Sequence, residues 1–393
     1  MTKYGLEALI ASSSANVLYA SDLCPYGKSL VFLPRERNVE GAIVSPISGP
    51  TPVVLMSPPW INDVRYYGKF YTVTRWASAP LTDSERRLVK AQESWEKTGE
   101  TDPVSLIINI LKERGITKGK IGVDESELPP EHPFWHKTKS SLPDLKAVTA
   151  DSIFREIRMV KSEEEIRRIQ EATRITEKAW GTALNQTKEG MTEKEFADIY
   201  HCTILSENGK ISSRMGMYGA PIAFGRRTAF VDIAQPSDYR LKKGDLIRLD
   251  GGCSYMGYPC DTGRSAVLGE PDEKLRKYYG ALLEGEQLSL EMAKPGVKPS
   301  TIFRAVVDTV REKGIPHYER HHVGHGSGIE GYDPPLIAPN VETPLEEGMV
   351  LCFETPYYEV GWGGPMVEDI VVINSKAPRL LTNFDPQLHV IRT

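Results

Sequence analysis

The stretch L-I-R-L-D-G-G, residues 246–252, has the pattern of a strand that ends in a carboxylate and a glycine turn. Apolar and polar residues alternate up to Asp250, and Gly251-Gly252 then allow the chain to turn. The segment C-D-T-G-R, residues 260–264, brings Asp261 eleven positions after Asp250. This spacing predicts two neighbouring antiparallel strands with a carboxylate on each.

Three further side chains of the same chemical kind follow. His325 lies in V-G-H-G-S-G, Glu354 ends an apolar run that begins at Met349, and Glu368 interrupts the apolar residues before Ile370. Carboxylates inside apolar strands are costly to bury unless they are paired or bound to metal. Four carboxylates and one imidazole suit two divalent ions (Mn, Co, Fe or Zn) better than one tetrahedral zinc. Two ions about 3.5–4 Å apart can hold a hydroxide as a nucleophile, so the pattern predicts a dinuclear hydrolase.

Length and composition limit the other classes of function. A chain of 393 residues is long enough for two domains with substantial cores. The net charge is −5 without a basic stripe, which argues against a nucleic-acid partner. No apolar run approaches a membrane span, and the first residues lack the plan of a signal peptide. Five scattered cysteines fit reduced thiols, so we expect a cytoplasmic protein. Cys253 and Cys260 match no zinc spacing.

The pattern of apolar residues predicts two domains of different type. In residues 1–155 short apolar runs alternate with helical stretches, which indicates an α/β domain. In residues 156–393 helices begin with capping boxes at Ser162 and Thr192, and strand-like segments carry the candidate ligands. Helices that cover one face of a curved antiparallel sheet are the expected result, so the fold class is α+β.

The ligand order Asp, Asp, His, Glu, Glu, with its flanking words G-H-G-x-G-x-E, E-E-G-M-V and E-D-I-V-V-I, resembles the pita-bread metallopeptidase family. This family includes prolidase, aminopeptidase P and creatinase. The resemblance covers essentially the whole chain, from N-V-L-Y at 16–19 onward. It implies a creatinase-like α/β domain, a pita-bread catalytic domain and a homodimer. It also implies that Glu354 is the general base and that His321 lines the substrate site.

Three positions depart from the family pattern. Ile233 and Tyr332 stand where the peptidases usually carry histidines, and Met366 stands where they usually carry an arginine. The loss of one oxyanion donor typically costs about 100- to 1000-fold in rate, so the departures predict weak prolidase activity. Tyr332 can still donate a hydrogen bond. Arg226 and Arg227 precede Ile233, and they are either candidates to grip an acidic substrate or a solvated loop pair.

Three functions remain open at this point. The first is an Xaa-Pro peptidase acting on a short peptide. The second is an enzyme of the same fold that acts on a small polar substrate, as an amide or C–N hydrolase or as a lyase similar to dimethylsulfoniopropionate lyases. The third is a binding module without activity, which the complete set of five ligands disfavours.

Overall fold

The computed structural model describes residues 1–23, 28–47, 60–68, 76–96, 102–211, 222–230 and 235–392. Two compact units make up the chain, Met1–Arg155 and Glu156–Thr393. One of the short apolar runs of the first domain, P-V-V-L-M at 52–56, and the candidate Ile233 lie outside the described residues. Among those that are described, no helix combines the length and the apolar character that crossing a membrane requires.

The first unit is a mixed sheet with side chains buried on both faces. Its strand order is β4-β3-β2-β1-β5-β6. The β1–β2 and β2–β3 pairs are antiparallel, whereas the other neighbours are parallel. The strands are β1 (Ala8–Ala11), β2 (Leu30–Pro34), β3 (Ala42–Pro46), β4 (Asp63–Tyr67), β5 (Gly119–Val123) and β6 (Leu145–Thr149). The helices are η1 (Thr2–Tyr4), α1 (Ser14–Ser21), α3 (Asp83–Glu96), α4 (Pro103–Glu113), α5 (Pro133–Ser141) and α6 (Asp151–Met159).

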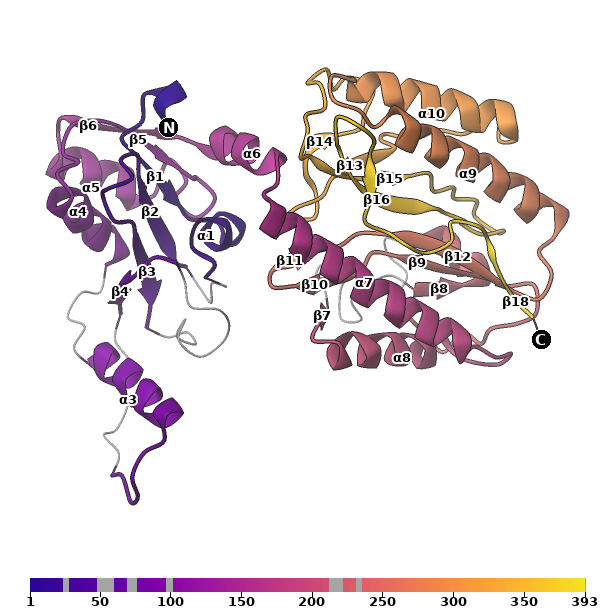
Figure 1. Cartoon of the computed structure of the whole chain (residues 1–393), viewed down its shortest axis with the longest axis horizontal. Coiled ribbons are helices and arrows are strands. Elements are labelled where there is room, and N and C mark those ends of the chain that lie inside the picture. Colours follow the sequence, from indigo (N-terminus) through magenta and orange to yellow (C-terminus); the bar gives the residue numbers. More distant parts are fainter. Residues whose placement is uncertain are drawn as a thin grey trace. The chain divides into compact units, whose positions relative to one another are not determined.

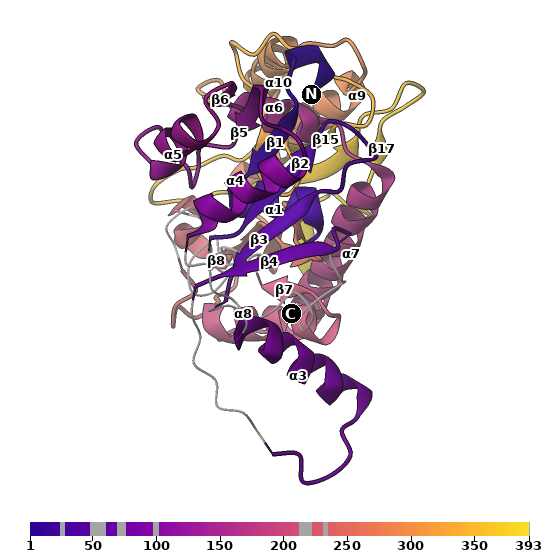
Figure 2. The ribbon, with the colours of Figure 1, turned by 90° about the vertical axis from the view of Figure 1, so that its left-hand side faces the viewer.

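Alternation along β1 explains why helices lie on both sides of this sheet. Ala8 and Ile10 belong to a core with α4 and α5, whereas Leu9 and Ala11 belong to a second core with α1 and the start of α6. Successive strand side chains point to opposite faces, so a strand that is apolar throughout needs cover on both. Figures 1 and 2 show α4 and α5 on one side of the sheet and α1 on the other.

The second unit is a larger sheet, mostly antiparallel, together with two pairs of helices. The sheet order is β14-β13-β15-β16-β12-β9-β8, with β17 paired to β16 and β18 paired to β12, and a small sheet β11-β10-β7 lies beside it. Its strands are β7 (Lys210–Ile211), β8 (Ile222–Phe224), β9 (Leu246–Asp250), β10 (Cys253–Tyr255), β11 (Tyr258–Pro259), β12 (Gly263–Leu268), β13 (Gly324–Gly326), β14 (Asp333–Leu336), β15 (Val350–Glu354), β16 (Glu368–Val372), β17 (Arg379–Leu380) and β18 (His389–Ile391). The helices are η2 (Gly225–Phe230), α7 (Glu163–Asn185), α8 (Glu193–Ser206), α9 (Glu273–Met292) and α10 (Pro299–Lys313).

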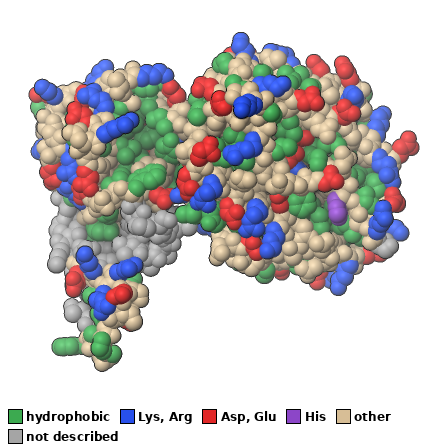
Figure 3. All heavy atoms as spheres, in the orientation of Figure 1, with side chains coloured by type: hydrophobic (Ala, Val, Ile, Leu, Met, Phe, Trp, Pro, Cys, Tyr) green, Lys and Arg blue, Asp and Glu red, His purple; other side chains and the backbone are tan. Residues whose placement is uncertain are grey.

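The helix pairs follow the sequence signals. Both predicted capping boxes are present, with Ser162 and Glu165 beginning α7 and Thr192 and Glu195 beginning α8. The pair α7–α8 contacts β8 and β10, and the pair α9–α10 lies near β15 (Figure 1). Each pair therefore covers its own half of the unit. The prediction of an α+β, pita-bread architecture is confirmed. On the face shown in Figure 3, basic and acidic side chains are interspersed, in keeping with the small net charge.

Candidate active site

Five neighbouring segments of the larger sheet bring the five predicted ligands together. Asp250 ends β9, Asp261 lies between β11 and β12, His325 is the middle of β13, Glu354 ends β15 and Glu368 begins β16. Strand register explains the convergence. Gly263 is opposite both Asp250 and Glu368, and Glu354 is opposite Glu368. Residues far apart in the sequence thus meet where β9, β12, β15 and β16 end or begin.

Side-chain atoms of four of the five, all but Glu354, belong to groups close enough to share a cation. Ligand atoms of Asp250, Asp261 and Glu368 all lie within 4.8 Å of one another. His325 Nε2 lies 3.7 Å from Asp261 Oδ2 and 4.0 Å from Glu368 Oε1. Cys352, which sequence analysis did not assign to the site, forms a second group with His325 and Glu368 within the same limit.

The electrostatics of this cluster favour a bound cation. Burial and the neighbouring carboxylates of Asp261 and Glu354 raise the pKa of Glu368 well above its usual range. Burial lowers the pKa of His325, so its ring is neutral. His325 Nδ1 lies 3.1 Å from the Gly326 carbonyl, which fixes the proton on Nδ1 and leaves the Nε2 lone pair toward the carboxylates. Buried like charges with a neutral imidazole are the donor set of a divalent metal site.

A cavity of about 590 Å³ opens over this cluster. The residues lining it are Asp250, Gly251, Gly252, Pro259, Cys260, Asp261, Arg320, His321, His322, Gly331, Tyr332, Glu354 and Tyr358. The two candidates His321 and Tyr332 are thus beside the candidate ligands. The Tyr332 ring stacks on His325, with 3.7 Å between centroids and 16° between planes, and about half of Tyr332 stays exposed.

His322 also belongs to the site. If 319–325 were extended, alternation would point His322 away from the site that His321 lines. Instead the chain is irregular before β13, and His322 is buried with Nδ1 at 2.9 Å from Glu354 Oε1. The Gly324 N–H also approaches Nδ1, at 3.3 Å. Nδ1 therefore accepts from Gly324 when it carries no proton, and it can donate to Glu354 when it does.

Two arginines in the site were missed from the sequence. Arg248 is fully buried and donates to Asp250 at 2.6 Å and to the Tyr358 hydroxyl at 3.2 Å. Arg320 lies 3.5 Å from Glu354. Burial alone would raise the pKa of Glu354, but His322 and Arg320 outweigh it and lower the value to about 2. The alternation in 246–250 already places Arg248 on the face of Asp250, whereas no local pattern indicates Arg320.

The remaining candidates lie elsewhere. Arg227 is held by the buried carboxylate of Glu193 at 3.0 Å and by the Gln235 carbonyl at 2.8 Å. Arg226 is exposed, and neither arginine is among the residues lining the cavity. Met366 is fully buried and packs on Gly263, beneath the cluster rather than inside the cavity. Among the described residues, none of these three lines the cavity, and their part in substrate binding stays a prediction.

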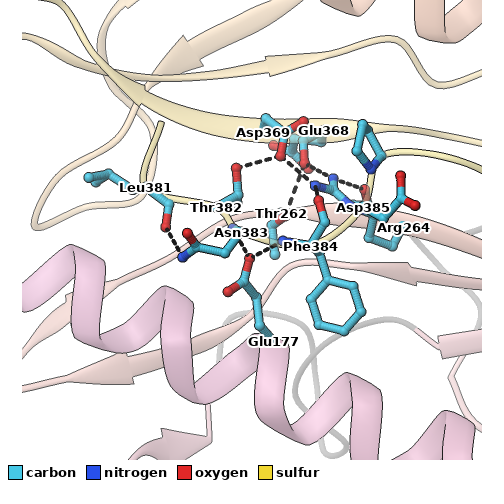
Figure 4. Close-up of polar contacts among 12 residues, drawn as sticks. Glu177, Thr262, Arg264, Glu368, Asp369, Leu381, Thr382, Asn383, Phe384 and Asp385 are labelled. Carbon is cyan, nitrogen blue, oxygen red and sulfur yellow. Dashed lines mark hydrogen bonds and ion pairs between the residues drawn. The ribbon is translucent and has the colours of Figure 1, made fainter. Parts of the chain in front are cut away.

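A polar network fixes the strand that carries Glu368. Arg264 donates to the Glu368 carbonyl and to the Asp369 carboxylate, and Thr382 donates to the same carboxylate (Figure 4). Thr262 adds a hydrogen bond to the Glu368 carbonyl at 3.0 Å. Because these partners are buried, the backbone of Glu368 is held from below while its carboxylate faces the cluster.

Fold and site together define a metal-dependent hydrolase of the pita-bread class. The profile of metallopeptidase family M24 matches residues 167–375, and the chain belongs to this family. The resemblance drawn from the sequence is thereby confirmed, and the chain is a metal-dependent hydrolase that resembles Xaa-Pro peptidases. The family implies divalent metal ions.

The most similar proteins point to the same group. An Xaa-Pro dipeptidase of Pyrococcus horikoshii is 33% identical over 271 residues, which are 67% of this chain and 73% of the relative. The uncharacterized peptidase YqhT of Bacillus subtilis is 29% identical over 63% of this chain and 69% of its own length. The crystal structure of an X-Pro aminopeptidase from Thermotoga maritima superposes with a TM-score of 0.76 at 23% identity, covering 99% and 97% of the two chains.

Proposed function

We propose that this chain hydrolyses the amide bond before proline in short peptides, at a centre of two divalent ions. The proposed ligands are Asp250, Asp261, His325, Glu354 and Glu368. The observation that carries the proposal is the convergence of Asp250, Asp261, His325 and Glu368, with Glu354 lining the same cavity, which is large enough for a short peptide. The Xaa-Pro dipeptidases among the relatives support the substrate class.

The other roles in the proposed reaction are assigned to residues of the chain itself. Divalent ions held by these ligands would make a bound water acidic enough to lose a proton at neutral pH and would polarise the scissile carbonyl. Glu354 then accepts the proton of the attacking water and returns it to the leaving nitrogen, and His322 orients its carboxylate. His321 and the Tyr332 hydroxyl line the cavity, where they can donate hydrogen bonds to the developing oxyanion.

The cavity alters the expectation of weak activity. That expectation rested on three positions. Ile233 and Tyr332 stand where the peptidases usually carry histidines, and Met366 stands where they usually carry an arginine. The cavity contains other cationic and proton-carrying groups, Arg320 and His322, which sequence analysis had not placed there. We therefore expect measurable Xaa-Pro hydrolysis. An amide hydrolase or lyase of small polar substrates remains the second candidate. The observation that favours it is the Tyr332 ring, which lies over the candidate ligand His325.

Metal-reconstituted protein tests the proposal directly. Protein loaded with Mn or Co is assayed on Ala-Pro, on small amides and on a sulfonium carboxylate. We expect turnover of Ala-Pro, and loss of both metal and activity in Asp261→Ala and His325→Ala. Asp308→Ala, on the exposed face of α10, is the matched control and should keep both. Full metal content in both ligand variants would contradict the ligand assignment, and turnover of the sulfonium compound alone would favour the second candidate.

The resemblance to the family supports three further proposals. Manganese is a suitable ion for this oxygen-rich set, although Co, Fe and Zn fit the same donors. The chain is expected to form a homodimer. It is also expected to work in the cytoplasm, in keeping with the free thiols of Cys202, Cys253, Cys260 and Cys352.

A further inference from the structure

Arg320 is the cationic side chain best placed to meet a ligand in the cavity. It lines the cavity with 8% of its side chain exposed, and its Nε donates to the His322 carbonyl at 3.3 Å. Its guanidinium lies over the Tyr358 ring, 5.5 Å from the centroid. These contacts fix the plane of the guanidinium but use fewer than its five N–H donors. A guanidinium held in this orientation can donate paired hydrogen bonds to a carboxylate of a ligand, in addition to its contact with Glu354.

Arg248 provides a comparison within the same site. It lies over the same Tyr358 ring at 4.8 Å, but it is fully buried and donates at 2.6 Å to Asp250 and at 3.1 Å to the Gly364 carbonyl. The positive charge of Arg248 is therefore paired with the carboxylate of Asp250 inside the protein. The contact of Arg320 with Glu354 is longer, at 3.5 Å, than the 2.7–2.9 Å typical of charge-assisted hydrogen bonds. Of the two arginines, Arg320 is the one that lines the cavity, where its N–H donors can meet a ligand.

The charge of the site favours an anionic substrate. Two divalent ions would neutralise the four carboxylates of the proposed centre. Arg248 and Arg320 would then leave the cavity positively charged, which attracts a negative group and disfavours a neutral one. Without an anionic ligand, the nearly buried charge of Arg320 would face the carboxylate of Glu354 at the longer distance of 3.5 Å.

Distance indicates where on the substrate the negative group lies. Arg320 is 3.5 Å from Glu354, so a group that it binds lies next to the reacting amide. In a dipeptide the free carboxylate is one residue beyond the scissile bond, a spacing of about 3.8 Å along the chain. Resting on the proposed function, we propose that Arg320 is a specificity-determining residue that binds this carboxylate. The enzyme then prefers dipeptides to longer or capped peptides.

The test compares Ala-Pro with Ala-Pro-amide, which differ only in the terminal charge. Wild type should prefer Ala-Pro. Arg320→Gln should lower kcat/KM on Ala-Pro by about 100-fold, mainly through KM, and change the amide less than about 3-fold. Arg320→Lys should recover part of the loss, since it keeps the charge without the fork. Arg276→Gln, an exposed arginine of α9, is the matched control and should leave both substrates unchanged.

Other outcomes decide against the proposal. An arginine that only positions Glu354 would lose activity on both substrates equally in Arg320→Gln, and that result overturns the inference. So does a wild type that hydrolyses the amide as well as the free acid. The metal content of each variant is measured alongside and should equal that of wild type. If Arg320→Gln does not fold, Arg320→Lys takes its place in the comparison.

A binding measurement separates this inference from the proposed function. Calorimetry follows L-proline and L-prolinamide added to metal-loaded wild type and to Arg320→Gln. We expect L-proline to bind wild type and to bind the variant at least about 10-fold more weakly, with L-prolinamide weak in both. If neither peptide is hydrolysed but this pattern appears, the proposed reaction is wrong and the carboxylate site stands. If wild type does not discriminate between the two ligands, the carboxylate site is wrong.

Discussion

The geometry of the proposed metal centre depends on Gly263. It is paired with both Asp250 and Glu368. A Cβ at this position would lie 2.1 Å from Met366 Cε and 2.5 Å from its sulfur, so the glycine is required by the buried methionine beneath it. Met366 therefore fills the space under the cluster, where a longer charged side chain would need a partner.

A double-mutant cycle tests this packing. Gly263→Ala should cost about 1–3 kcal/mol of stability, because the extra methyl overpacks the contact. Met366→Ala alone should cost about 2–5 kcal/mol through the cavity that it leaves. The double variant should lose clearly less than the sum, as measured by urea unfolding. Gly280→Ala, in α9 with nothing near its Cβ position, is the control and should not destabilise. Strict additivity would show that the two sites are independent.

Single residues also show what the sequence could not reveal. Asp250, Glu354 and Glu368 were predictable because each ends or interrupts an apolar run, whereas Asp261 and His325 were identified by their spacing and flanking words. His322 and Arg320 were not, because the chain before β13 is irregular and periodicity gives no direction there. The arginine pair Arg226 and Arg227 was singled out for its charge alone, and Glu193, which holds Arg227, is far from it in sequence.

At the scale of elements, Asp124 joins three segments of the first unit. Its Oδ2 accepts from the N–H groups of Ser12 and Ser13 and from Asn16 at the start of α1, and its Oδ1 accepts from Ser126 N. The residue follows β5 directly and is fully buried. Burial alone would raise its pKa, but these hydrogen bonds outweigh burial and lower the pKa to about 2.

This depressed pKa predicts a pH-dependent contribution to stability. The pKa of about 2 in the folded protein lies below the usual aspartate value of 3.8. The carboxylate therefore stabilises the fold by about 2 kcal/mol above pH 4 and loses that contribution as the pH falls through 2. Asp124→Asn should be less stable than wild type at pH 7, and the difference should narrow by about 1 kcal/mol at pH 3 in urea unfolding. A difference that grows on acidification would refute the assignment.

Elements were predictable to different degrees. Helices α7 and α8 follow from local capping boxes, and β9 and β12 are the antiparallel neighbours that the spacing of Asp250 and Asp261 indicated. The β10–β11 hairpin inserted between them was not foreseen. Strand β13 is only three residues long and contains two glycines, so its place beside β15 is set by tertiary pairing rather than by any local pattern.

For the whole molecule, the family resemblance predicts a stable homodimer. Light scattering of the metal-loaded protein at micromolar concentration should give twice the mass of one chain. Dilution and moderate salt should not change this value if the interface is of the obligate kind. A mass equal to one chain under all these conditions would rule out the dimer.

The position of the Cys352 thiol predicts that the proposed metal centre also binds heavy metals. It is fully buried, yet its sulfur lies within 4.8 Å of the ligand atoms of His325 and Glu368. Nitrogen, sulfur and oxygen donors together suit soft ions such as cadmium, which the oxygen-rich remainder of the site would hold less tightly. Trace cadmium should therefore inhibit the enzyme, and Cys352→Ser should need more cadmium for the same inhibition. Equal sensitivity of wild type and Cys352→Ser to cadmium would show that cadmium inhibits at another site.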